Sequence, residues 1–196
     1  MEIFNDLPAI WDFSWQQLEK APHQKKNPWR TPVIANIIGG QASQRTVVLR
    51  RVDKKGRCLR FYADLRSAKI SQKDEKISFS WLFYNAVKQI QLRVHTEGSV
   101  VSVEESDKIW DDLPVFARSP YASIQRPGSI TAEPRDVLPP DFLTQTPAQT
   151  DAARVNFVAV DNWVTALEFL QLHRAGQRRA RWSWEDNSWE GTWLIP

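Results

Sequence analysis

Apolar and polar residues alternate along several short stretches of this chain, a pattern typical of half-buried β-strands. The alternation is clearest over 77–83 and over 90–95, where Gln91, Arg93 and His95 fall on one face. Other short apolar runs are found at 33–38, 45–52, 58–63, 100–103, 155–160, 163–172, 178–184 and 189–195. Eight or nine of these ten stretches are expected to be strands, at the spacing typical of an antiparallel β-barrel.

Turn residues lie between many of these runs. Gly39-Gly40 follows the first, and Asp53-Lys54-Lys55-Gly56 follows the second, with Gly56 at the position that tolerates a positive φ. The first three strands are therefore expected to form an antiparallel meander. Glu97-Gly98 similarly predicts a hairpin that joins 90–95 to 100–103.

Helices are expected at only a few places. An amphipathic helix is predicted over 12–20, and Ser67 is a candidate N-cap for a short helix over 68–72. Charged and mixed segments at 104–113 and 116–124 predict two more.

The segment 127–149 contains five prolines and is expected to be a surface loop. It does not resemble a domain linker, because neither side of it forms a complete domain. We therefore expect one domain over 1–196, mainly β with flanking α-helices, in which the Pro-rich loop precedes the last strands. That position would allow the loop to act as a lid.

Composition removes several classes of function. The chain has 196 residues, a formal net charge of +3 and one cysteine, which cannot form an internal disulfide. The N-terminus lacks the pattern of a signal peptide, and a cytoplasmic protein is expected. The three histidines have no ligand spacing, so no metal site is expected, and motifs of nucleotide triphosphatases and serine hydrolases are absent.

The basic residues could support anion binding. Arg45 and Arg50 bracket one predicted strand, and Lys69 follows Ser67 in the first turn of a predicted helix. A phosphate suits a helix N-terminus flanked by cations, although the same residues could simply solvate an exposed face. Four arginines within 173–181 could likewise bind a nucleic acid, a small anion or only water.

The order of these residues resembles the flavin-binding core of the pyridoxamine 5′-phosphate oxidase family. The similarity is carried by Arg45-Thr46-Val47-Val48-Leu49-Arg50, by 53–56 and by Phe61-Tyr62-Ala63-Asp64-Leu65-Arg66-Ser67-Ala68-Lys69. It continues in order to the C-terminus. The resemblance implies an FMN-binding split β-barrel and a homodimer with FMN at the subunit interface. No stretch of the sequence approaches the ~20 apolar residues of a membrane span, so no membrane partner is expected. A nucleic-acid partner is not favoured, because it would rest on the arginines of 173–181 alone.

Carried over residue by residue, the resemblance implies a set of cofactor contacts. Arg45, Arg50, Ser67 and Lys69 would hold the FMN phosphate, Tyr62 and Ala63 would line the flavin, and Gln91 would hydrogen-bond its ring. Gln125 would come from the partner subunit, and Arg181 would lie near the polar edge of the ring. The complete implied set is Arg45, Thr46, Val48, Arg50, Tyr62, Ala63, Ser67, Lys69, Gln91, Gln125 and Arg181, with Arg178 as a candidate substrate contact.

Some positions depart from the family pattern. Ala68 replaces a second basic residue, while Ile109, Leu113 and Ala180 stand where the vitamin B6 enzyme has Tyr, Arg and His for its substrate. Without these donors the chain would bind pyridoxine 5′-phosphate poorly. We therefore expect an FMN-dependent oxidoreductase related to that enzyme, with an unknown substrate. The alternatives are a flavin-binding or flavin-sensing module without turnover and a basic nucleic-acid-binding barrel.

Overall fold

The computed structural model describes residues 3–70, 76–134 and 137–196. The chain forms two compact units, each assembled from separate segments. The first unit contains Met1–Phe61, Lys76–Ser99 and Asp161–Pro196, and the second contains Tyr62–Glu75 and Val100–Val160.

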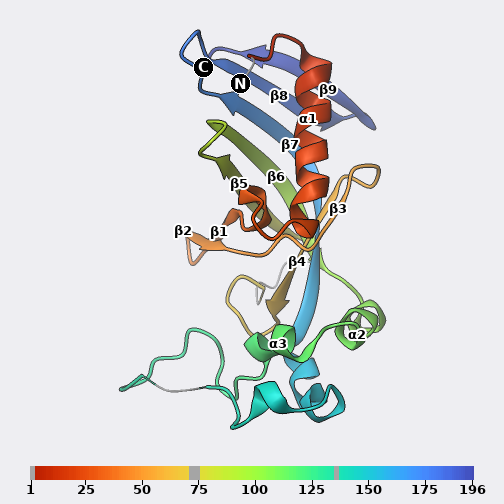
Figure 1. Cartoon of the computed structure of the whole chain (residues 1–196), viewed down its shortest axis with the longest axis vertical. Coiled ribbons are helices and arrows are strands. Elements are labelled where there is room, and N and C mark those ends of the chain that lie inside the picture. Colours follow the sequence, from red (N-terminus) through yellow and green to blue (C-terminus); the bar gives the residue numbers. More distant parts are fainter. Residues whose placement is uncertain (1–2, 71–75, 135–136) are drawn as a thin grey trace. The chain divides into compact units, whose positions relative to one another are not determined.

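Antiparallel strands dominate the described structure (Figure 1). They are β1 (Val33–Ile38), β2 (Gln41–Thr46), β3 (Arg51–Asp53), β4 (Cys58–Asp64), β5 (Ile77–Asn85), β6 (Ile90–Val100), β7 (Phe157–Gln171), β8 (Arg178–Glu185) and β9 (Ser188–Leu194). The strand order is β2-β1-β5-β6-β7-β4-β3, with β8 paired to β7 and β9 to β8. Among the described residues the sheet does not close on itself, but the mainly β, antiparallel class with flanking helices is confirmed.

The β1–β2 hairpin confirms the first predicted turn, because Gly39 and Gly40 both have positive φ angles, of 58° and 80°. The predicted meander is wrong, because 45–52 is not one strand. After β2 the amide of Val47 donates to Pro32 O at 3.1 Å and that of Leu49 to Arg30 O at 2.8 Å. This segment is thus held by the chain before β1 while Leu49 enters the core, and the next strand, β3, pairs with β4.

The predicted hairpin at Glu97-Gly98 is also wrong, since β6 continues through both residues. A Cβ on Gly98 would lie 2.7 Å from the Asn162 side chain and 3.0 Å from the Phe79 ring. The glycine is therefore required for close packing in the sheet and not for a turn.

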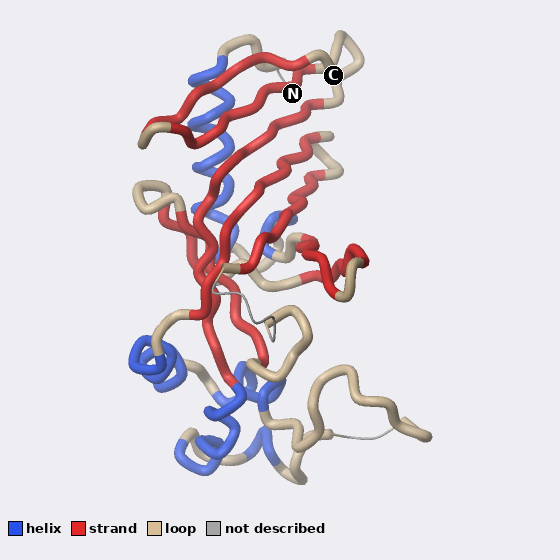
Figure 2. The backbone as a smooth tube through the Cα atoms, turned by 180° about the vertical axis from the view of Figure 1, so that it is seen from behind, coloured by secondary structure: helices blue, strands red, loops and turns tan. Residues whose placement is uncertain are grey.

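Helix α1 (Leu7–Lys20) begins five residues before the predicted start at position 12. Asp6 is the N-cap, and its carboxylate accepts a hydrogen bond from the amide of Ala9 at 2.8 Å. Within the first unit, Trp11 on this helix contacts the rings of Trp182 and Trp189, with centroids 5.6 and 4.9 Å apart. The helix therefore packs on the β8–β9 hairpin, as Figure 2 shows.

The second unit contains α2 (Val103–Asp111), α3 (Val115–Arg118) and several 3-10 turns. Its core is formed by Trp110, Tyr121, Ala153 and Phe157. The helix predicted over 116–124 is shorter and starts earlier, because α3 gives way at residue 119 to a 3-10 turn. The described part of 127–149 contains only 3-10 turns as regular structure. No helix in the described ranges is long and apolar enough to cross a bilayer.

Candidate functional site

Two predicted phosphate contacts, Ser67 and Lys69, lie together in the turn after β4. The Ser67 hydroxyl donates to Asp64 O at 2.6 Å, and Lys69 Nζ donates to Ser67 Oγ at 3.0 Å. The predicted helix is not present over 68–70, which form turns, while 71–72 lie outside the described residues. An ammonium and a hydroxyl are thus juxtaposed, but without the helix N-terminus that the sequence predicted.

The two predicted arginine anchors belong to the first unit. Arg45 lies near the end of β2, and its guanidinium donates to Asn36 Oδ1 and, at 2.6 Å, to Ser43 Oγ. The backbone amide of Arg50 donates to Arg60 O at 2.8 Å. Between the two arginines, Thr46 is exposed and Val48 is half-buried.

The predicted flavin contacts Tyr62, Ala63 and Gln125 belong to the second unit. The Tyr62 ring packs edge-on against Phe157 with centroids 5.1 Å apart, and Ala63 is buried. Gln125 is exposed, and its carbonyl accepts a hydrogen bond from the Ser123 hydroxyl at 3.0 Å.

The other predicted contacts, Gln91, Arg181 and Arg178, belong to the first unit. Gln91 is half-buried on β6, and Arg181 is exposed on β8. Arg178 is held by the side chain of Asn5, with both hydrogen bonds at 3.0 Å or less. A substrate that used Arg178 would therefore have to compete with Asn5.

A charged cluster on the first unit was not predicted. Glu168 on β7 accepts hydrogen bonds from Arg93 on β6 and, at 3.0 Å, from Arg179 on β8. Partial burial acts to raise the pKa of Glu168, but these two arginines outweigh it and the net pKa is lowered. Burial, with smaller contributions from Arg181 and Arg93, lowers the pKa of His95. The alternation of polar and apolar residues over 90–95 predicted that Arg93 and His95 share one face of the strand, but it did not predict the partners of that face on β7 and β8.

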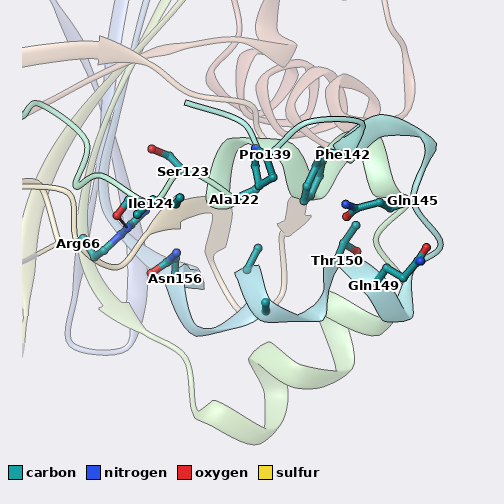
Figure 3. A pocket seen from close by; sticks show the side chains of 12 residues that line it. Arg66, Ala122, Ser123, Ile124, Pro139, Phe142, Gln145, Gln149, Thr150 and Asn156 are labelled. Atoms are coloured by element: carbon teal, nitrogen blue, oxygen red, sulfur yellow. Dashed lines mark hydrogen bonds between the residues drawn. The ribbon is translucent and has the colours of Figure 1, made fainter. Parts of the chain in front are cut away.

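The second unit also has a hollow of about 360 Å³ (Figure 3). Its apolar wall includes Pro139 and Phe142, while Gln145, Gln149 and Asn156 contribute amides. The full lining is Arg66, Ala122, Ser123, Ile124, Pro139, Phe142, Gln145, Gln149, Thr150, Ala152, Ala153 and Asn156. Within the described ranges no group of acidic, histidine or cysteine side chains is arranged to hold a metal.

Comparison with protein families gives a match to the N-terminal half of the chain. Residues 12–102 match the family model "Pyridoxamine 5′-phosphate oxidase, FMN-binding domain". No curated protein matches the sequence significantly. The matched segment contains every predicted cofactor contact except Gln125 and Arg181.

Solved structures share the fold. A pyridoxamine 5′-phosphate oxidase-related, FMN-binding protein from Nostoc punctiforme aligns over 100% of both chains with a TM-score of 0.71 and 20% identity. PhzG from Burkholderia lata, solved with tetrahydrophenazine-1-carboxylic acid, covers 98% of this chain and 94% of its own, with a TM-score of 0.68 and 19% identity. A protein from Clostridium acetobutylicum related to general stress protein 26 aligns over 89% and 95%, with a TM-score of 0.53 and 9% identity.

These neighbours confirm the predicted split-barrel fold, with a sheet that is not closed among the described residues. The family match confirms the resemblance and supports FMN as the cofactor. Residues 12–102 therefore match the FMN-binding domain of the pyridoxamine 5′-phosphate oxidase family, and the chain shares the fold of FMN-binding relatives of that enzyme.

Proposed function

We propose that this protein is an FMN-dependent oxidoreductase acting on a substrate other than pyridoxine 5′-phosphate. The observation that carries the proposal is the FMN-binding family match, which spans both the Arg45–Arg50 segment and the Ser67–Lys69 turn. FMN would supply the hydride or electron chemistry, and the protein would bind and orient it.

The donor set fits a phosphate. Two guanidinium groups, an ammonium and a hydroxyl are the groups that proteins commonly use for a phosphate dianion. In the second unit, the hydrogen bond from Lys69 to Ser67 holds this cation beside the hydroxyl in a defined turn. Ser67 and Lys69 would contact the FMN phosphate, with Arg45 and Arg50 as the other anchors, while Tyr62, Ala63 and Gln91 would contact the flavin.

Titration of the apoprotein with FMN and riboflavin tests the phosphate contacts, because the two ligands differ only in the phosphate. Lys69→Ala should weaken FMN binding by roughly 1.5–3 kcal/mol, about 10- to 150-fold, and leave riboflavin binding unchanged. Lys55→Ala, at an exposed turn of the first unit, is the matched control. Equal FMN affinity in the wild type and Lys69→Ala would remove Lys69 from the site.

Turnover needs a separate assay, since a flavin-binding module without catalysis would pass the titration. Anaerobic mixing of the FMN-loaded protein with NADH or NADPH should bleach the flavin absorbance if the protein is an oxidoreductase. No bleaching with these or other tested reductants would favour a sensing or storage role.

We further propose a homodimer located in the cytoplasm. An apolar hollow of about 610 Å³ in the second unit, lined in part by the exposed Leu65, Val103 and Val155, supports a partner surface. Light scattering during size-exclusion chromatography should give twice the chain mass, whereas a monomer at micromolar concentration would contradict the dimer.

A further inference from the structure

We propose that Arg66 is a positioning residue that locks the Ser67–Lys69 turn to the segment carrying Gln125. The inference rests on the proposed FMN site, because those two segments hold predicted cofactor contacts. All of the residues involved lie in the second unit.

The Arg66 guanidinium is fixed first by Asp64, two residues before it. Nε and Nη2 donate to the two carboxylate oxygens at 3.0 and 2.7 Å, and the Arg66 amide donates to the same carboxylate at 2.8 Å. The Asp64 side chain is only 8% exposed and that of Arg66 24%. Such a two-pronged pair in a shielded place has a defined geometry.

The same arginine then bridges to the neighbouring segment in both directions. Arg66 Nη1 donates to Ile124 O at 3.3 Å, and Arg126 Nε donates back to Arg66 O at 2.7 Å (Figure 3 shows the first of these). Gln125 lies between these two positions. The two bonds therefore connect its flanking residues directly to the turn that contains Ser67 and Lys69.

A second connection reinforces the first. The amide of Leu65 donates to Asn156 O at 2.8 Å, and the Asn156 side chain donates to Tyr121 O at 2.9 Å. The turn after β4 and the segment around 121–126 are thus joined at two places. These contacts hold the residues on either side of the exposed Gln125.

An arginine beside Ser67 suggests a different role, that of a direct phosphate contact compensating for Ala68. The geometry argues against it. Three of the five N–H groups of Arg66, one each on Nε, Nη1 and Nη2, already donate within the protein, to Asp64 and to Ile124. Hydrogen bonding to Asp64 raises the pKa of Arg66 above its ordinary value, so the guanidinium stays charged. That charge is already paired with the Asp64 carboxylate.

The two roles predict opposite effects of Asp64→Asn on FMN binding. If Arg66 positions the turn, Asp64→Asn and Arg66→Ala each weaken FMN binding, about tenfold, and the double variant is no weaker than the singles. If Arg66 contacts the phosphate directly, Asp64→Asn frees its charge and tightens binding. Tighter binding by Asp64→Asn would overturn the proposal.

Arg66→Lys covers the case in which Arg66→Ala does not fold. Lysine keeps the charge but cannot donate parallel hydrogen bonds to both carboxylate oxygens of Asp64. We therefore expect Arg66→Lys to weaken FMN binding as Arg66→Ala does. Full FMN affinity in Arg66→Lys would overturn the positioning role. Arg51→Ala is the matched control, since Arg51 forms an exposed pair with Asp53 at the same spacing of two residues.

Hydrogen exchange of the apoprotein provides a readout that needs no FMN. Arg66→Ala and Asp64→Asn should speed amide exchange in the peptide 119–126 and leave peptides of the first unit unchanged. Unchanged exchange in 119–126 would overturn the brace, whether or not FMN binds. A wild-type protein that fails to bind FMN would instead overturn the proposed function. The exchange rates of 119–126 would still show whether Arg66 holds this segment to the turn after β4.

Discussion

Loss of the Arg118 side chain should strongly destabilise the second unit. Its side chain is 2% exposed, and its guanidinium donates to the carbonyls of Trp110, Leu113 and Pro147 at 2.8–2.9 Å. It also pairs with Asp151 at 2.8 Å. The Arg118 guanidinium thus connects the C-terminal end of α2, the residues before α3 and the segment that begins at Pro147.

The cost of removing Arg118 can be worked out from these contacts. A hydrogen bond involving a charged group contributes roughly 1.5–3 kcal/mol, but bonds made by one side chain are not additive. We therefore expect Arg118→Ala to lower the free energy of unfolding by roughly 3–5 kcal/mol, about the contribution of two such bonds, because three backbone carbonyls lose their charged donor. Asp151 is 58% exposed, so water can solvate it, and Asp151→Asn should cost less than about 1 kcal/mol.

Urea unfolding followed by circular dichroism, with hydrogen exchange on the peptide 103–121, measures the effect and locates it. Trp110 is the single tryptophan of the second unit, so total tryptophan fluorescence reports mostly on the first unit and serves as an internal comparison. Arg174→Ala, at an exposed position, is the control. A loss under 1 kcal/mol for Arg118→Ala, or an equal loss for Asp151→Asn, would contradict a stabilising role for the hydrogen bonds from Arg118 to the three carbonyls.

Three further predictions concern the first unit. Burial is the largest cause that raises the pKa of Cys58, to about 11, so iodoacetamide should alkylate the native thiol at pH 8 much more slowly than the unfolded one; equal rates would contradict this. Because Arg93 and Arg179 lower the pKa of Glu168, its contribution to stability is present above pH about 4.5 and is lost as the pH falls through the folded-state pKa. Glu168→Gln should therefore flatten the acid limb of the stability curve, and an unchanged limb would exclude the pair. Gly98→Ala should lower the free energy of unfolding in urea by roughly 1–3 kcal/mol, because the added methyl group overpacks the sheet. An unchanged free energy of unfolding would contradict the close packing at Gly98.

The strands could be predicted because their side chains alternate with the pleat, whatever their partners. A glycine in the sequence did not by itself distinguish a turn from a strand, since Gly39 and Gly40 form a turn whereas Gly98 permits close packing inside β6. In the turn after β3 the positive φ falls on Arg57, while Gly56 donates its amide to Asp53 at 2.9 Å. These outcomes depend on neighbours far along the chain, which local pattern does not contain.

The candidate site shows the same division. Lys69 and Ser67 could be brought together from the sequence, because they are two residues apart on one turn. The sequence pattern wrongly predicted a helix over 68–70, because it does not show that the Ser67 hydroxyl donates back to Asp64 O and that these residues form turns. The bond from Arg66 to Ile124 joins residues 58 positions apart, and no local rule predicts it.

The absorbance spectrum of freshly purified protein, followed by heat release and identification of any yellow chromophore, tests directly whether the chain binds FMN. We expect flavin bands, FMN in the released fraction, and recovery of the spectrum when FMN is returned to the apoprotein. A colourless protein that FMN neither restores nor stabilises against unfolding would contradict it.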